Sequence, residues 1–168
     1  LGMDYTKEKI KFQQTLNKLT PEQLRARIEL MGTQVADITS RTQQTYDEIA
    51  AAKRVWDIAR GDKTLYATPN GVLHLKPGQG ANIEKPLRDA YDKAGANYRS
   101  TISTVASLAA AKAKVKALAS VERDPVKAQE YTAQLEKIDE TDETLRLMAA
   151  DKHRDMEDLR QRISDLTD

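Results

Sequence analysis

The chain of 168 residues contains no cysteine, which excludes disulfide bonds, thiol catalysis and zinc–thiolate sites. Aromatic residues make up only 5 % of it, with one Trp and one Phe, so there is little material for a thick globular core. No apolar run approaches the roughly 20 residues of a transmembrane helix, so we expect no membrane span. Neither sign of charge dominates, because 27 basic residues stand against 26 acidic ones. A net charge of +1 offers no overall field that would attract nucleic acid.

Charged residues make up 32 % of the sequence and hydrophobic residues 39 %, a balance that suits long helices with narrow apolar seams. Three stretches carry seams whose spacing alternates between four and three residues, the heptad pattern of coiled coils. The first seam runs through Leu24, Ile28, Met31, Val35, Ile38, Thr42, Thr45, Ile49, Ala52, Trp56 and Ala59. The second runs through Leu87, Tyr91, Ala94, Tyr98, Thr101, Val105, Leu108, Lys112, Val115 and Ala119. The third runs through Tyr131, Leu135, Ile138, Asp142, Leu145, Ala149, Lys152, Met156, Leu159, Ile163 and Leu166.

Residues typical of helix ends bound these seams. Thr20 is a predicted N-cap, with Gln23 three residues later as its capping-box partner. Gly61 suits a helix end, and Asp124 followed by Pro125 suits a new helix start. We therefore predict helices over about 21–60, 83–120 and 125–167.

Three helices of equal length, joined by one short turn and one compact insertion, favour up-down-up packing. The predicted fold is all-α: an elongated antiparallel three-helix coiled-coil bundle over residues 20–168, with a short β-hairpin insertion at one end. The alternative is a helical hairpin whose third segment pairs with another copy of the chain. Residues 3–19 carry apolar side chains out of phase with the first seam. We interpret them as a short separate helix that either packs back on the bundle or continues as a stalk.

Residues 62–77 break the helical pattern and are predicted to form the hairpin tip. Two strand candidates, 64–68 and 72–76, flank Pro69-Asn70-Gly71, a sequence typical of a three-residue hairpin loop. A two-stranded hairpin alone is barely stable in water, so we expect its apolar face to close the end of the bundle.

The outward face and loop of this hairpin form the predicted contact with a partner. The register pairs Tyr66 with His74, and both side chains point away from the apolar face. A helix–helix linker needs only a few residues, whereas this one is much longer, and ordered loops on rigid scaffolds often carry function. The alternative is a purely structural cap. The predicted partner-binding residues are Tyr66, Thr68, Asn70, His74 and Lys76.

The sequence contains no recognisable catalytic arrangement. His74 and His153 fall far apart in the predicted fold, and no metal-ligand spacing occurs. The acidic run 136–143 lacks the turn glycine of a calcium loop and is interpreted as a solvated helix face. The basic cluster at 112–116 spreads around its helix without interleaved aromatic residues. We therefore expect no enzyme activity, no cofactor, no metal and no nucleic-acid partner.

Polar residues interrupt the seams, and antiparallel folding would bring several of them to one level. This predicted polar layer comprises Thr42, Thr45, Tyr98, Thr101 and Asp142. Polar seam residues reduce stability but fix the register of the helices. Lys112 and Lys152 are further charged seam positions, and we expect their long side chains to reach solvent.

The predicted function is that of a non-catalytic structural or interaction module. A rigid coiled-coil scaffold would present the hairpin tip for protein–protein recognition or assembly, as in a bacterial or phage assembly component, and could form a homo-oligomer. The long helices rich in Ala, Lys and Asp, with a non-helical tip at 62–77, resemble the receptor-binding region of colicin-type bacteriocins. They resemble the coiled coils of type III secretion translocators to a similar degree. These resemblances imply the alternative function, a receptor-binding segment of a secreted bacterial toxin or a secretion-system translocator.

Overall fold

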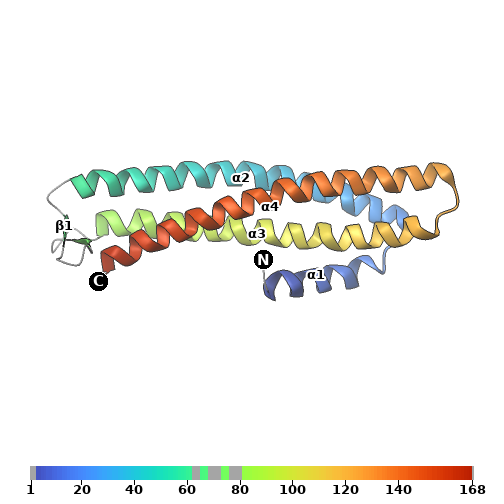
Figure 1. Cartoon of the computed structure of the whole chain (residues 1–168), viewed down its shortest axis with the longest axis horizontal. Coiled ribbons are helices and arrows are strands. Elements are labelled where there is room, and N and C mark those ends of the chain that lie inside the picture. The colour runs from blue at the N-terminus through green and yellow to red at the C-terminus, as the bar shows by residue number, and fades with distance from the viewer. Residues whose placement is uncertain (1–2, 62–64, 68–72, 76–80, 168) are drawn as a thin grey trace. The chain divides into compact units, whose positions relative to one another are not determined.

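The computed structural model describes residues 3–61, 65–67, 73–75 and 81–167. These residues form four helices, which are labelled in Figure 1, and one pair of short strands. The helices are α1 (Met3–Leu16), α2 (Pro21–Gly61), α3 (Ala81–Val121) and α4 (Pro125–Thr167). The strands are β1 (Leu65–Ala67) and β2 (Leu73–Leu75). Within the described segments, no helix combines the length and the apolar character needed to cross a bilayer.

The two predicted helix caps are present. The Thr20 backbone N–H donates to Oε1 of Gln23 at 2.9 Å, and the Gln23 backbone N–H donates to Oγ1 of Thr20 at 3.2 Å. This reciprocal capping box satisfies two backbone groups that would otherwise lack partners at the start of α2. At the start of α4, the Val126 backbone N–H donates to Oδ1 of Asp124 at 3.0 Å. Local chemistry therefore determines where both helices begin.

The chain divides into two compact units, and each of the three long helices contributes to both. Unit 1 comprises Leu1–Thr39 and Arg99–Ala149. Unit 2 comprises Ser40–Tyr98 and Ala150–Asp168. Each unit has a hydrophobic core of its own, and the two are described separately below.

The core of unit 1 contains residues from four helices. Leu16 of α1 is 1 % exposed and belongs to the same buried cluster as Leu24, Val105 and Leu145. Figure 1 shows α1 beside the part of α3 that belongs to unit 1. That part of α3 also buries small residues outside its predicted seam, which are Thr104, Ala106, Ser107, Ala110 and Ala111. Small side chains on a second face let another helix approach closely, so α3 packs on two sides here.

The predicted fold class is wrong, although its all-α part is right. The described chain has four helices and is not a three-helix bundle. Of the two arrangements predicted for the N-terminal helix, packing against the bundle is the one found: Leu16 belongs to the core, and Tyr5, Phe12 and Leu19 pack against that core. The physical reason is the second buried face of α3, whose small residues lie outside the predicted seam and allow another helix to pack there.

The predicted β-hairpin insertion is also corrected. β1 and β2 are three residues each, where the sequence suggested five, and they pair antiparallel with Tyr66 opposite His74. Such a short pair adds no layer to the fold, which is therefore all-α. The predicted loop Pro69-Asn70-Gly71 lies outside the described residues, as do all side chains of the two strands.

The core of unit 2 is formed by three helices. The predicted seam residues Ile49, Trp56, Leu87 and Leu159 are all buried here. The α3 residues of this core that lie deepest are Ile83, Leu87, Ala90 and Ala94. Their spacing of four, three and four is a heptad seam that differs in phase from the predicted one, which used Tyr91 in place of Ala90. The inward face of α3 is therefore turned slightly from the predicted one, and Tyr91 lies at the edge of the core.

Candidate functional site

A buried polar layer interrupts the core of unit 2. It comprises Thr42 and Thr45 of α2, Asn97 of α3 and Lys152 of α4. The whole Lys152 residue is only 1 % exposed, which is unusual for a lysine. Buried polar groups need hydrogen-bond partners, and this layer supplies them internally.

The amine of Lys152 has three contacts. Its Nζ donates to Oγ1 of Thr45 at 2.5 Å and to the backbone carbonyl of Thr42 at 3.4 Å. It also lies 3.5 Å from the centroid of the Tyr46 ring, a cation–π geometry. Within the described chain these are its partners, and no carboxylate is among them. The layer therefore encloses the amine without a neutralising counter-charge.

This burial changes the proton affinity of the amine. Desolvation lowers the pKa of Lys152 to about 8, although Asp155 and Asp151 on the same helix oppose the shift. Burial also raises the pKa of the neighbouring Tyr46 phenol, with Asp151 and Asp155 adding to the effect. Both groups favour their neutral forms more than they would in water.

The other half of the layer links α2 to α3. The Thr42 hydroxyl accepts from Nδ2 of Asn97 at 3.0 Å and lies 3.2 Å from its Oδ1. The Thr45 hydroxyl donates to the Thr42 backbone carbonyl at 2.8 Å. Because these bonds form only when the residues are level, the layer fixes how the three helices of unit 2 align.

The predicted polar layer is confirmed for Thr42 and Thr45, which are buried. The separate expectation that the Lys152 side chain reaches solvent is wrong. Lys112 is partly exposed as predicted, and its Nζ lies 2.6 Å from Oδ1 of Asp139 in unit 1. Asp142, also in unit 1, pairs with Arg146 at 2.8 Å. The sequence signal that was missed is the position of the seam on α3. A seam through Ala90 and Ala94 continues, three residues later, to Asn97 and not to Tyr98.

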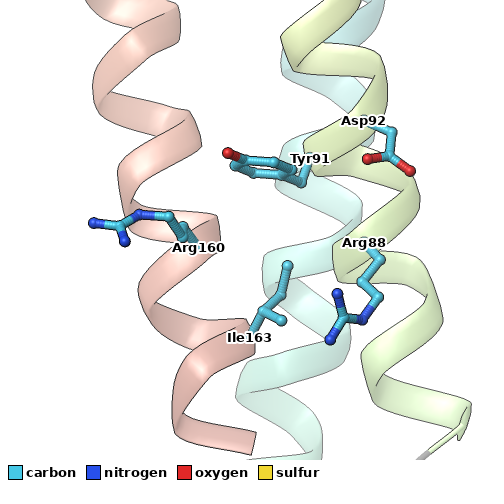
Figure 2. Close-up of a pocket in the computed structure, with 5 residues that line it drawn as sticks. All are labelled: Arg88, Tyr91, Asp92, Arg160 and Ile163. Atoms are coloured by element: carbon cyan, nitrogen blue, oxygen red, sulfur yellow. The ribbon is translucent and has the colours of Figure 1, made fainter. Parts of the chain in front are cut away.

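A second feature of unit 2 is a surface pocket between α3 and α4 (Figure 2). Its cavity measures about 230 Å³. It is lined by Arg88, Tyr91, Asp92, Arg160 and Ile163. Figure 2 shows Tyr91 and Ile163 reaching from opposite helices into the space between them, with Arg88 also directed toward it. Tyr91 and Ile163 pack against the core of unit 2, so this apolar part of the pocket is held in place.

The two arginines of the pocket are only weakly engaged. Arg88 pairs with Glu84 at 2.7 Å, and Arg160 pairs with Glu157 at 2.7 Å, each within its own helix. Exposed ion pairs within one helix contribute only about 0.2–0.5 kcal/mol. Both guanidinium groups can therefore exchange these partners for others at little cost. Sequence reasoning missed both arginines, although each directly follows a buried seam leucine and so borders the seam.

The structure does not gather the predicted partner-binding residues into a described site. Tyr66 and His74 lie opposite each other in β1 and β2, and Thr68, Asn70 and Lys76 lie outside the described residues. His153 lies in unit 2 with its ring centroid 5.7 Å from that of Tyr98. The described part of the chain contains no group of three or more His, Asp or Glu residues that could hold a metal ion.

Comparison with known proteins gives no match: no family model, no curated protein and no solved structure matches this chain. The resemblance to bacteriocin receptor-binding regions and to translocator coiled coils therefore stays a prediction. The function has to be inferred from the polar layer and the pocket themselves.

Proposed function

We propose that this chain is a non-catalytic helical scaffold that binds another protein, and that the pocket between α3 and α4 is a point of contact. The observation that carries the proposal is the composition of the pocket, which combines Tyr91 with Arg88 and Arg160. Tyrosine and arginine are enriched among the residues that dominate binding energy at protein interfaces.

The size of the pocket favours a protein partner over a small organic ligand. Sites that enclose drug-sized ligands usually measure about 300–1,000 Å³. At about 230 Å³ this pocket falls below that range and suits one side chain projecting from a larger partner. The Tyr91 ring and Ile163 offer apolar contact, and the guanidinium of Arg88, which is directed toward the space between the helices in Figure 2, offers hydrogen-bond donors.

The rigidity of the pocket also supports a binding role. Tyr91 and Ile163 pack against a core that contains Leu87 and Leu159, both fully buried. A preformed contact surface loses less conformational entropy when a partner binds. The scaffold would thus present the pocket in one conformation, which is the property that long packed helices provide.

Site-specific photo-cross-linking tests the proposal. A photoreactive amino acid is placed at Arg160, which lines the pocket, and in a second protein at Arg154. Arg154 is a matched control because it also lies exposed on α4 and also pairs with an acid three residues earlier, Asp151. We expect irradiation in cells that express the chain to produce one discrete protein adduct from position 160 and none from position 154.

The mass of the adduct identifies the kind of partner. Twice the chain mass of 18.8 kDa would indicate a second copy of this chain, and any other mass a different protein. Equal adduct patterns from both positions, or no adduct from position 160, would contradict the proposed contact.

A further inference from the structure

The Thr45 hydroxyl, the Thr42 backbone carbonyl and the Tyr46 ring form a cage around the amine of Lys152. This cage favours the neutral amine over the charged ammonium group. The two oxygen acceptors and the ring face can meet the three N–H donors of an ammonium, but none of them carries a full negative charge that would neutralise it. Thr45 Oγ1 is itself committed as a donor to the Thr42 carbonyl at 2.8 Å. A buried charge with no opposite charge beside it is disfavoured by desolvation, while a neutral amine is well accommodated.

The charged groups that face this cage are engaged elsewhere. On α4, Asp155 lies 3.7 Å from the amine of Lys53, and Asp151 pairs with Arg154. On α2, the facing titratable group is Tyr46, whose ring covers the amine of Lys152.

From α3, the group that faces this level is neutral Asn97, bonded to Thr42. Tyr98 of α3 faces His153 of α4, with ring centroids 5.7 Å apart. Lys93 of α3 pairs with Glu48 of α2 at 3.2 Å. None of these groups pairs a carboxylate with the amine of Lys152, whose contacts are with Thr42, Thr45 and Tyr46.

We infer that Lys152 makes unit 2 a proton-sensitive element: a proton added to its Nζ loosens the packing of α4 against α2, and loss of that proton tightens it. The sign follows from the proton affinities of the two states. The pKa of Lys152 is lowered from 10.5 to about 8 in the folded chain. Between these values the unfolded chain holds the proton and the folded chain does not, so the stability of unit 2 rises with pH. Below about pH 8 both states are protonated, and this stabilisation is absent.

The chain contains a matched control for this inference. Lys112 also occupies a seam position, but it lies partly exposed and its amine is 2.6 Å from the Asp139 carboxylate. The substitutions Lys152→Met and Lys112→Met each replace a lysine by an unbranched apolar side chain of similar length. Lys152→Met removes a buried amine, whereas Lys112→Met removes a partly exposed one.

Urea unfolding followed by Trp56 fluorescence tests the inference, because Trp56 is the single tryptophan and lies buried in the core of unit 2. The native chain, Lys152→Met and Lys112→Met are each measured at pH 7 and at pH 9.5. For each protein, the change in its unfolding constant between the two pH values is determined. We expect the unfolding constant of the native chain to fall about 25-fold more than that of Lys152→Met over this interval. Lys112→Met should keep the native pH dependence. The same pH dependence in the native chain and in Lys152→Met would overturn the inference.

A direct titration of the native protein does not depend on any variant folding. The ¹³Cε chemical shift of Lys152 is followed by NMR as a function of pH, with Lys112 as the internal reference. We expect a midpoint near pH 8 for Lys152. A midpoint above pH 10 would show that the amine is not enclosed, and the inference would be wrong.

Discussion

Replacing Leu16 by Ala lowers the free energy of unfolding by about 3 kcal/mol, whereas Ile10→Ala lowers it by less than about 1 kcal/mol. Both residues lie on α1, but Leu16 is 1 % exposed and Ile10 is 50 % exposed. Truncating a buried leucine removes its apolar burial and leaves a cavity, while an exposed isoleucine loses little. Urea denaturation followed by circular dichroism at 222 nm measures both changes.

This comparison tests whether α1 belongs to the core of unit 1. A helix that was merely appended to the bundle would tolerate Leu16→Ala as well as Ile10→Ala. Equal stability of the two variants would therefore disprove the four-helix packing of unit 1 and favour the predicted alternative in which the N-terminal helix continues as a stalk.

Replacing Leu159 by Ala also destabilises the chain by about 3 kcal/mol, and here Leu147→Ala is the matched control with an expected loss below about 1 kcal/mol. Both are leucines of α4, but Leu159 is fully buried in the core of unit 2 and Leu147 is 63 % exposed. The fluorescence of Trp56, which belongs to the same core as Leu159, reports the transition during urea denaturation.

The result depends on which face of α4 is turned toward the core. If Leu159→Ala were no more destabilising than Leu147→Ala, the face of α4 that packs in unit 2 would be a different one. The pocket beside Leu159 would then be misplaced as well, because Arg160 borders the pocket only when Leu159 points inward.

The helices were predictable because their signals are local. Capping residues such as Thr20 and Asp124 act on backbone groups within three residues, so the chain itself shows where α2 and α4 begin. The repeating spacing of buried residues likewise needs no knowledge of neighbouring helices. The long helices consequently begin and end close to their predicted positions.

The number of packed helices was not predictable in the same way. Whether Ala106 and Ala110 are solvent-exposed or buried depends on whether another helix lies over them, and alanine is common in both settings. The aromatic side chains of Tyr91 and Tyr98 suggested a seam through these positions, but the smaller Ala90 and Asn97 are the buried ones. Side-chain size was thus a misleading guide to the inward face of α3.

The candidate sites depend on tertiary contacts that no spacing reveals. A lysine at a seam position usually extends its amine to solvent, and Lys112 in unit 1 remains partly exposed. Lys152 is enclosed because Thr45 and Tyr46 of another helix close over it, which only the packed structure shows. The pocket likewise forms from Tyr91 and Ile163, which are 72 positions apart in the sequence numbering (163 − 91).

The proposed protein contact can be measured once cross-linking has identified the partner. The measurement is the dissociation constant of that partner for the native chain, for Arg160→Glu and for Arg154→Glu, by isothermal titration calorimetry. Reversing the charge at the pocket should weaken binding at least about tenfold, a loss of about 1.4 kcal/mol, because interface arginines often dominate affinity. The same reversal at Arg154 should change the constant by less than about twofold. Equal affinities of the two variants would contradict the claim that this scaffold binds its partner through the pocket between α3 and α4.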